Sequence, residues 1–399
     1  MGVQPLYDLT PLLKLMALGV LIAMAPLLWV WYHNRHAGPA HRLQALGLLT
    51  LFLTFDLLLF GAFTRLTDSG LGCPDWPGCY GSASPLGAHA EITAAQSAMP
   101  TGPVTHRKAW IEMIHRYLAT GVGVLIIALT VQAWRTHRRT PLSGARHPWW
   151  ASLTLIWVLI QGAFGALTVT MKLFPAIVTL HLLGGIGLLA LLCVQATGHQ
   201  QAVWQQNAHP ISNHLRVGLW ACLGLLIVQS ALGGWVSTNY AVLACTTFPT
   251  CQGSLWPNMN FEQAFEIWRP LGLLSNGRHI SFEALTAIHY THRLVAYMVV
   301  AALLVLWWTL HRRDRQGTQG PLASQRRWLL GLTLLQVATG LSNVVLDWPL
   351  LAAVLHTGGA AALITVLVWC LASTRTWPTQ EPTAPENTNT PTGVRRNSA

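Results

Sequence analysis

Charged side chains are scarce in this chain. Aspartate, glutamate, lysine and arginine together make up 9% of its 399 residues, whereas an ordinary soluble domain carries roughly 25%. Hydrophobic residues make up 52%. This small number of charged residues cannot cover the surface of a folded protein in water. The composition therefore excludes an ordinary soluble globular protein and favours one that is surrounded by lipid.

Acidic residues are the scarcer of the two charge types. The chain has 13 of them against 24 lysines and arginines, which gives a formal net charge of +11. Basic residues gathered on one surface would suit a nucleic-acid partner. Here they fall mainly in short loops between apolar runs, which is the pattern of a membrane topology signal. We therefore expect membrane lipid, and no nucleic acid, as a partner.

Apolar runs of about 20 residues, each long enough to cross a bilayer as a helix, recur along the chain. They predict an all-α polytopic membrane protein with nine spans, at 12–32, 44–64, 113–134, 150–170, 175–197, 215–238, 286–310, 328–346 and 350–372. Two long polar loops, 65–112 and 239–285, interrupt the spans.

The distribution of lysine and arginine sets the expected orientation. These residues are concentrated on one side of the spans, for example in 135–146 and 312–327, and are few in the two long loops. The positive-inside rule places the basic side in the cytoplasm. Both long loops and the N-terminus then face the exterior or the periplasm. The tail after residue 375 is rich in Pro, Thr and Asn, and we expect it to be disordered.

The chain contains an internal duplication. The segment "GAFTRLTDSGLGCPDWPGCYGS" (61–82) matches "GGWVSTNYAVLACTTFPTCQGS" (233–254), and in both a glycine leads the first cysteine by 12 residues. Two further pairs of blocks match in the same order: 112–125 with 289–302, and 161–185 with 336–360. These matches indicate tandem repeats of four helices that enter the membrane in the same direction, related by a pseudo-two-fold axis along the membrane normal.

The duplication also predicts the domain organisation, with the first span outside the repeat. We expect an N-terminal span and cytoplasmic loop (1–43), a first four-helix repeat (44–197), a cytoplasmic linker (198–214), a second four-helix repeat (215–372) and a disordered cytoplasmic tail (373–399).

Four histidines occupy repeat-equivalent positions within or at the ends of the apolar runs: His115, His181, His292 and His356. At 1.5 Å per helical residue, all four lie roughly one to two turns below the outer surface. Histidines inside a membrane usually face the bundle interior, and the simplest interpretation is a hydrogen-bonded packing residue. Two imidazoles per half at equal depth also suit a haem iron held on opposite faces.

Small residues follow two of these histidines. Gly184 and Gly185 come after His181, and Gly359 and Ala360 come after His356, at positions i+3 and i+4. Small side chains there would let a porphyrin approach the helix backbone. The alternative is close helix–helix packing, which is common in membranes.

An arginine follows the first histidine of each half. Arg116 and Arg293 are candidates for binding haem propionates, and the alternative is that they extend to the membrane interface. The halves differ one turn outward, where the first has Glu112 and the second has His289. A carboxylate near an iron-bound ligand can move protons, whereas the alternative role is to cap the helix start. His289 could replace His292 as a ligand or tune it, although the repeat alignment favours His292.

Cysteine is also scarce, at seven residues. Three are single and lie in apolar runs, where cysteine acts as a small hydrophobe. The other four form two pairs with one spacing, Cys73 with Cys79 and Cys245 with Cys251, one pair in each long loop. An oxidising exterior favours a disulfide within each pair, whereas zinc would want four ligands at tighter spacing. A reducible, electron-exchanging disulfide is the alternative to a purely structural one.

Together these features resemble the haem A synthase family, over about residues 44–372. The resemblance rests on the tandem repeat, the paired cysteines and the residues Glu112-x-x-His115-Arg116, His181, His292-Arg293 and His356. The segment "TRLTDSGLGCPDWPGCYG" is similar to the first outer loop of proteobacterial members. The span 12–32 is additional to the eight membrane helices that are usual in this family.

The resemblance implies an oxidoreductase of haem biosynthesis in the bacterial inner membrane, with the cysteine loops in the periplasm. The enzyme converts a methyl group of haem O to the formyl group of haem A with oxygen from water, by two oxidations and loss of water from a geminal diol. His115 and His181 would flank the substrate haem, and His292 and His356 would hold a haem b that transfers electrons. Glu112 would be the catalytic carboxylate.

The family also implies partners. A haem O synthase, which is a farnesyltransferase, would supply the substrate, and a quinone is one candidate for the electron acceptor. Two other functions compete with this one. A disulfide–quinone oxidoreductase explains the cysteine pairs but leaves the duplicated histidines without a role. A membrane dihaem quinol cytochrome explains the histidines but not the difference between Glu112 and His289. The duplication alone would also suit a transporter, but no break in the helices supports one.

Overall fold

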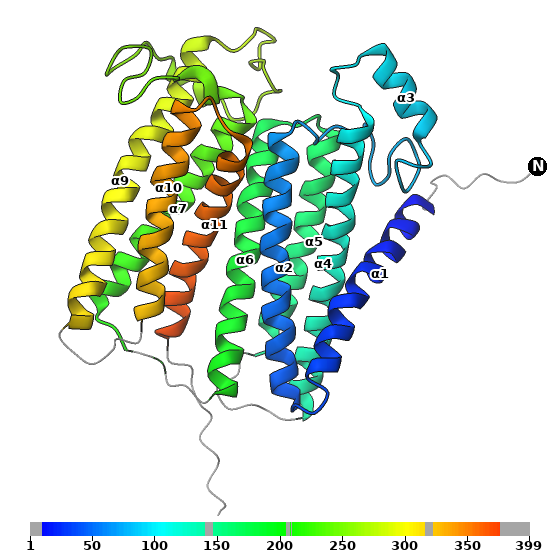
Figure 1. Ribbon diagram of the computed structural model, residues 1–399, viewed down its shortest axis with the longest axis vertical. Helices are drawn as coiled ribbons and strands as arrows, with labels where there is room; N and C mark the ends of the chain where they lie inside the picture. Colours follow the sequence, from blue (N-terminus) through cyan, green and yellow to red (C-terminus); the bar gives the residue numbers. More distant parts are fainter. Residues whose placement is uncertain (1–9, 140–146, 205–207, 209, 316–321, 376–399) are drawn as a thin grey trace, which may run out of the picture.

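The computed structural model of the protein describes residues 10–139, 147–204, 208, 210–315 and 322–375. Its regular secondary structure within these ranges is helical (Figure 1). The elements are α1 (Thr10–His33), α2 (Pro39–Leu66), α3 (His89–Ala98), α4 (His106–Arg139), α5 (Trp149–Thr170), α6 (Pro175–Val203), α7 (Asn213–Thr238), η1 (Ala241–Ala244), α8 (Phe261–Ala264), α9 (Phe282–Arg315), α10 (Ala323–Val345) and α11 (Leu350–Ser373).

Nine of these helices, within the described part of the chain, are long and apolar enough to cross a membrane. Each coincides with a predicted span, so the prediction of an all-α polytopic membrane protein is confirmed. The short elements α3, η1 and α8 in the outer loops were not predicted. Helices α4 and α9 each have 34 residues and are therefore about 50 Å long, more than the bilayer core requires. Both begin several residues earlier than predicted, so their outer ends extend into the long loops.

Helix packing confirms the tandem duplication. In the first repeat α2 packs against α4 and α6, and α5 also packs against α4 and α6. In the second repeat α7 and α10 each pack against α9 and α11 in the same way. Between the repeats α6 contacts α11, and the contact of α2 with α11 has its counterpart in the contact of α7 with α6. The arrangement is what a pseudo-two-fold axis between α6 and α11 would produce.

The backbone of the connecting segments repeats as well. L-residues rarely adopt a left-handed conformation with positive φ, yet they do so here at repeat-equivalent positions. The pairs are Asp68 with Tyr240, Tyr80 with Gln252, Lys172 with Asp347 and Leu173 with Trp348. The duplication therefore extends to the local geometry of the turns as well as to the order of the helices. The predicted tail, 373–399, lies mostly outside the described residues.

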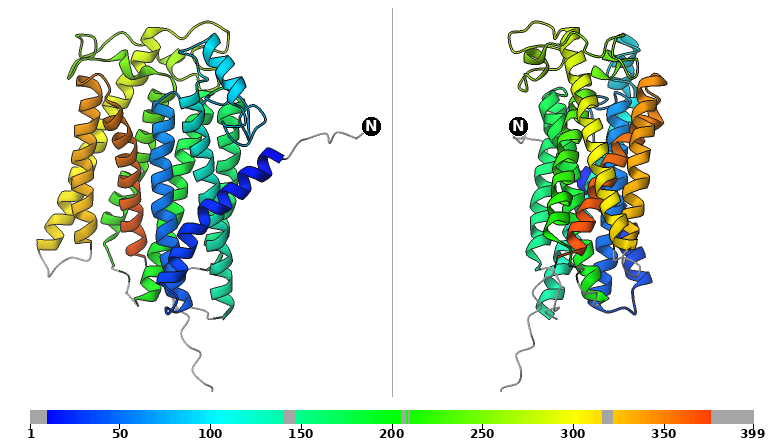
Figure 2. Two further views of the ribbon diagram at one scale, coloured as in Figure 1. Left: turned by 45° about the vertical axis from the view of Figure 1, so that its right-hand side comes forward. Right: turned by 90° about the vertical axis from the view of Figure 1, so that its left-hand side faces the viewer.

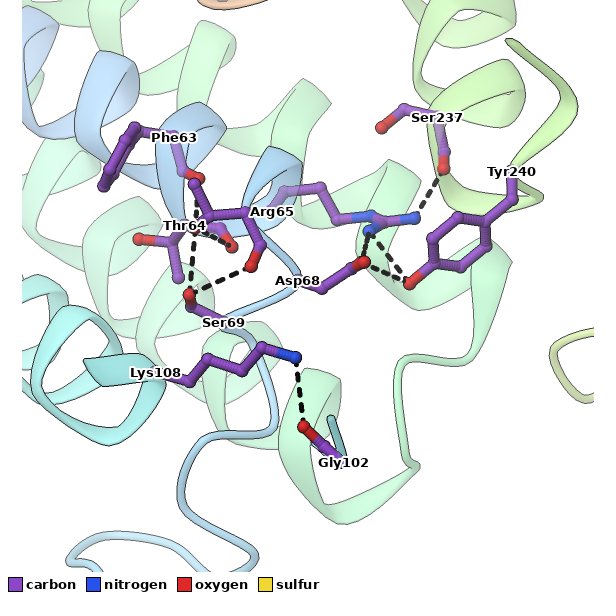
Figure 3. Close-up of polar contacts among 10 residues, drawn as sticks. Phe63, Thr64, Arg65, Asp68, Ser69, Gly102, Lys108, Ser237 and Tyr240 are labelled. Carbon is purple, nitrogen blue, oxygen red and sulfur yellow. Dashed lines mark hydrogen bonds and ion pairs between the residues drawn. The ribbon is translucent and has the colours of Figure 1, made fainter. Parts of the chain in front are cut away.

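The outer ends of α2 and α7 meet at two of these equivalent positions (Figure 3). Arg65 pairs with Asp68 at 3.2 Å and donates to the carbonyl of Ser237 at 2.5 Å. The hydroxyl of Tyr240 donates to Asp68 at 2.6 Å, and the guanidinium of Arg65 lies 4.4 Å from the centre of the Tyr240 ring. This network joins the two repeats on the face that carries the long loops.

Helix α1 lies outside the duplication and leans across α4 (Figures 1 and 2). Its backbone approaches α4 closely, since a Cβ at Gly19 would lie 2.4 Å from Cγ2 of Thr120. Near its N-terminal end, Leu15 joins a buried cluster with Cys73 and Cys79. The additional span therefore packs against the first cysteine loop.

The fold predicts how introduced cysteines will react with a membrane-impermeant maleimide in intact cells. The native cysteines are either disulfide-bonded or buried, so background labelling should be low. Ser97 lies exposed on α3 in the first long loop, and His36 lies exposed in the turn between α1 and α2 at the opposite end. Only one of Ser97→Cys and His36→Cys should label before the cells are opened, and both should label afterwards. Equal labelling of the two in intact cells would contradict the arrangement.

Candidate functional site

Each of the four predicted histidines lies against a glycine of a neighbouring helix. A Cβ added at that glycine would lie 3.0 to 3.4 Å from an atom of the imidazole ring. The pairs are His115 with Gly61 of α2, His181 with Gly165 of α5, His292 with Gly233 of α7, and His356 with Gly340 of α10. Gly61 matches Gly233 in the repeat, and Gly165 matches Gly340, so the same recess recurs at all four positions.

These glycines were missed as functional residues, although a signal for them was present. Gly61 and Gly233 stand in the matched loop blocks, and Gly165 and Gly340 each follow a matched glutamine by four residues. The recess could not be foreseen because it depends on how each helix is rotated toward its neighbour.

In the second repeat the two imidazoles lie close together. The ring centres of His292 and His356 are 6.5 Å apart and the rings are nearly perpendicular, at 84°. Two imidazoles that ligate one metal ion from opposite sides would have centres about 6 Å apart, given metal–nitrogen distances of about 2 Å. The observed separation therefore suits a haem iron between these two side chains.

The outer nitrogen of His356 is held by a hydroxyl. Thr339 Oγ1 lies 2.9 Å from His356 Nδ1, and it donates its own proton to the carbonyl of Leu335 at 2.7 Å. The hydroxyl oxygen must therefore accept a hydrogen bond from Nδ1–H, which leaves the lone pair of Nε2 free for a metal. Gln336 further fixes this turn by donating to the His356 carbonyl at 2.9 Å.

The imidazoles of the first repeat are held differently. The ring of His115 stacks on Phe60, with centres 6.3 Å apart and an interplanar angle of 8°. Nδ1 of His181 is buried without a hydrogen-bond partner, because Phe164 occupies the position that Thr339 has in the second repeat. The first pair thus lacks the hydroxyl that orients His356, although Nδ1 of His292 is also without a partner among the described residues.

The small residues after the histidines have a packing role. A Cβ at Gly184 would lie 1.6 Å from Nε2 of Gln161, and a Cβ at Gly359 would lie 2.2 Å from Nε2 of Gln336. The space that we expected for a porphyrin at these two glycines is occupied by glutamine side chains. The alternative of helix–helix packing therefore describes Gly184 and Gly359.

Arg116 is bound to the first cysteine loop. Its Nη1 donates to the carbonyls of Asp75, Pro77 and Gly78 at 2.6 to 3.2 Å, and its Nη2 lies 2.5 Å from Glu112. The guanidinium therefore fastens the loop to α4, and a propionate contact for Arg116 stays a prediction without a contact to support it.

Arg293 makes the equivalent contacts in the second half. It donates to the carbonyls of Cys245, Thr247 and Thr250 at 2.5 to 3.2 Å. Thr247 and Thr250 are the repeat equivalents of Asp75 and Gly78, so the duplicated arginine binds the same part of each loop. Its predicted propionate role likewise stays a prediction.

Glu112 lies between the loop and the first histidine. Its side chain is 5% exposed, and it accepts hydrogen bonds from the backbone N–H of Cys73 at 2.8 Å and from Arg116. Each carboxylate oxygen has a second lone pair that these bonds leave available. In the second repeat His289 takes this position and contacts the carbonyl of Ala241 at 3.1 Å. Its ring is directed toward the loop backbone, and its Nε2 accepts a hydrogen bond from Arg293 Nε at 3.3 Å.

Both cysteine pairs form disulfides, Cys73 with Cys79 and Cys245 with Cys251. All four residues are fully buried, so a thiol could reach the sulfur atoms only after the loop opened. No group of three or more His, Cys, Asp or Glu side chains able to hold a metal ion occurs in the described part of the chain. A zinc site built from the cysteine pairs is therefore not supported, whereas a haem iron needs only two protein ligands.

Comparison with known proteins finds a matching family model and similar sequences. The family model described as cytochrome oxidase assembly protein (COX15-CtaA) matches residues 44–368. A haem A synthase of Shewanella oneidensis is 40% identical over 327 residues, which cover 80% of this chain and 93% of that protein. The chain belongs to the haem A synthase family. Helix α1 precedes the part of the chain that the family model matches.

More distant haem A synthases agree with this assignment. The protein of Symbiobacterium thermophilum is 29% identical over 325 residues, covering 79% of this chain and 90% of the relative. That of Paramagnetospirillum magneticum is 27% identical over 371 residues, covering 84% and 94%. The match to haem A synthases thus includes both repeats, so the second histidine pair lies within it as well as the first.

The arginine contacts predict how easily each disulfide can be reduced in this haem A synthase family member. Arg116→Ala removes three bonds to the first loop and should speed reduction of Cys73–Cys79 by dithiothreitol at least about tenfold, since hydrogen bonds of charged groups contribute about 1.5 to 3 kcal/mol each. Alkylation of the released thiols followed by mass spectrometry measures each pair separately.

Arg293→Ala is the matched control, because it should accelerate only Cys245–Cys251. If either variant accelerated both pairs alike, the arginine would be stabilising the whole fold and the specific contact with its own loop would be contradicted.

Proposed function

We propose that this protein is a haem A synthase, which oxidises a methyl group of haem O to the formyl group of haem A. The observation that carries the proposal is the second histidine pair, whose ring centres lie 6.5 Å apart in a position that the repeat duplicates. The proposal is supported by membership of a family whose named relatives are haem A synthases.

In this proposal the two repeats have different roles. His292 and His356 hold a haem b, because Thr339 orients the second of these ligands and favours a permanent group. His115 and His181 flank the substrate haem O, with the less constrained His181 ring suiting a molecule that exchanges. When bound, haem b supplies a one-electron carrier. The proposed units are 44–197 for the substrate site and 215–372 for the haem b site.

The overall reaction sets what the protein side chains must do. Conversion of a methyl group and one water to a formyl group releases four protons and four electrons. Glu112, one helical turn outward from His115, accepts protons from the substrate side, and its bonds to Arg116 and Cys73 N–H hold it in place. A carboxylate fixed in this way can act as a general base. The electrons leave to an external acceptor, for which a membrane quinone is the candidate.

The cellular setting completes the proposal. The nine apolar helices found among the described residues make the chain a multi-pass membrane protein, and we place it in the bacterial inner membrane with the cysteine loops in the periplasm. A haem O synthase, a farnesyltransferase, would supply the substrate. The oxidising periplasm would maintain the two disulfides, whose burial favours a structural role over electron exchange.

Replacement of Glu112 tests the assignment of the first repeat. Glu112→Ala should lower haem A formation by about 10²- to 10⁴-fold, the usual contribution of a general base, while the haem b spectrum of the purified protein persists. Haem A is measured by acid–acetone extraction after co-expression with a haem O synthase. Glu91→Ala, an exposed acidic residue of α3, is the control and should behave as wild type.

Two results would contradict the proposal. Loss of haem b from Glu112→Ala would reverse the roles of the two repeats. A wild-type protein that carries haem b but leaves haem O untouched would favour the dihaem quinol cytochrome, and one with no bound haem would favour the disulfide–quinone oxidoreductase.

The glycine recess gives an independent test of the second repeat. A Cβ at Gly340 would lie 3.1 Å from Cε1 of His356, whereas nothing lies within 4 Å of a Cβ at Gly331 on the same helix. Gly340→Ala should therefore displace the imidazole and weaken haem b retention about 10- to 100-fold, the usual effect of disturbing groups that orient a metal ligand. Gly331→Ala should retain wild-type haem b. Haem content and electron paramagnetic resonance spectra measure the effect, and identical spectra for the two variants would show that the recess does not position the ligand.

A further inference from the structure

A cavity of about 290 Å³ opens at the outer end of the first repeat. It lies between the end of α2 and the start of α4 and is lined by Thr67, Ser69, Thr105, Arg107, Lys108 and Ile111. Two of these residues carry positive charge and three carry hydroxyl groups. The lining therefore suits a small anionic group.

The cations of the cavity have no acidic partner. Among the described residues, neither Arg107 nor Lys108 forms an ion pair. Lys108 Nζ donates to the carbonyl of Gly102 at 3.1 Å (Figure 3), and an ammonium group has two further protons to donate. Two positive charges thus meet at a cavity without a carboxylate to neutralise them.

The nearest carboxylates are already paired elsewhere. Asp68 follows Thr67 directly in sequence, but its side chain is directed to Arg65 and Tyr240 (Figure 3). Glu112 is bound to Arg116 and to the Cys73 N–H. The charge of the cavity is therefore available to a ligand.

The cavity continues the helix face that carries the first histidine. Lys108, Ile111 and His115 are spaced three and four residues apart, so they share one face of α4. Lys108 lies seven residues from His115, which is about 10 Å along the helix axis. Glu112 lies beside this face, and Arg116 is fastened to the disulfide loop. The cavity thus lies outward of His115 along α4, where its cations are not committed to the loop.

In the second repeat the equivalent positions are occupied mainly by apolar side chains. In place of the hydroxyl and basic residues of the cavity it has Asn239, Ala241, Phe282, Ala284 and Leu285. Ala241 and Ala284 belong to a buried apolar cluster, with Leu285 packed against it.

An arginine of the second loop completes this closure. Arg269 is fully buried and donates to Asn239 Oδ1 at 2.6 Å. Burial lowers the pKa of its guanidinium below the usual value of an arginine. Among the described residues, the equivalent positions of the second repeat therefore lack the hydroxyl and basic lining of this cavity.

We propose that the Arg107–Lys108 cavity binds a propionate carboxylate of the substrate haem. This inference rests on the proposed function and assigns to the cavity the role that Arg116, fastened to loop carbonyls, does not show. The carboxylate accepts hydrogen bonds from Lys108 Nζ and from the Arg107 guanidinium. Charge-assisted bonds of this kind fix the orientation of the ligand as well as its affinity. The propionate edge would then set how the porphyrin is turned between His115 and His181.

Esterified substrate tests the inference directly. Purified protein with its haem b retained is titrated with haem O and with haem O dimethyl ester, and binding is followed by optical difference spectra. Wild type should bind the free acid about tenfold more tightly or better, a difference of about 1.4 kcal/mol. The double variant Arg107→Gln/Lys108→Gln should bind the acid less tightly and the ester unchanged, so that the two affinities come within about threefold of each other. The binding free energy lost for the acid is up to about 1.4 kcal/mol.

The control is Arg278→Gln, an exposed outer-loop arginine of the second repeat, which should keep the preference for the acid. Retention of the haem b spectrum in all variants shows that they have folded. Added salt should reduce the wild-type preference, since both cations are at least partly exposed and salt screens exposed charges.

Three outcomes would overturn the inference. Equal binding of acid and ester by wild type would show that no cation meets the carboxylates. A preference that persists in the double variant would place the carboxylates elsewhere. An unchanged preference, together with a changed response to nanodiscs of anionic rather than zwitterionic lipid, would assign the cavity to a lipid phosphate. Failure of the proposed function itself would look different, because wild type would then bind neither form and make no haem A.

Discussion

An imidazole ring inside a membrane helix bundle is the constraint on which this structure depends. A polar ring facing hydrocarbon is unfavourable, so each of the four histidines must find space and a partner within the protein. The bundle provides the space through a glycine on the facing helix. It leaves the Nδ1 atoms of His181 and His292 buried with no hydrogen-bond partner in the part of the chain that the structure describes. Rings that are closely seated but incompletely bonded are suited to a ligand that completes their environment.

Duplication built this environment twice, and small differences separate the two copies. Thr339 orients His356, whereas Phe164 offers His181 no hydrogen bond. Arg269 and an apolar cluster close the outer end of the second repeat, whereas the first retains an open basic cavity. Under the proposed function, these differences would let one copy retain its ligand and the other exchange it. Because the helix packing is common to both, the division of labour depends on a few side chains near the outer surface.

The cysteine loops are linked to the histidine-bearing helices. Each loop is held by the arginine that follows the first histidine of its repeat, through carbonyl groups at matched positions. In the first repeat Glu112 joins this network through the Cys73 N–H. The disulfide therefore stabilises a loop that in turn positions the carboxylate beside His115. This connection gives the buried disulfides a role that does not require them to exchange electrons.

The amino-acid sequence by itself determined the spans seen in the described chain, the tandem repeat and the repeat-equivalent positions of the four histidines. These features follow from the length, hydropathy and spacing of single segments, which do not depend on distant parts of the chain. Only the tertiary structure decided that Arg116 binds loop carbonyls, that glutamines fill the space beside Gly184 and Gly359, and that glycines face the imidazoles. Each of these contacts joins residues on different elements. Their geometry depends on the rotation and tilt of whole helices, which packing between helices sets and local sequence does not.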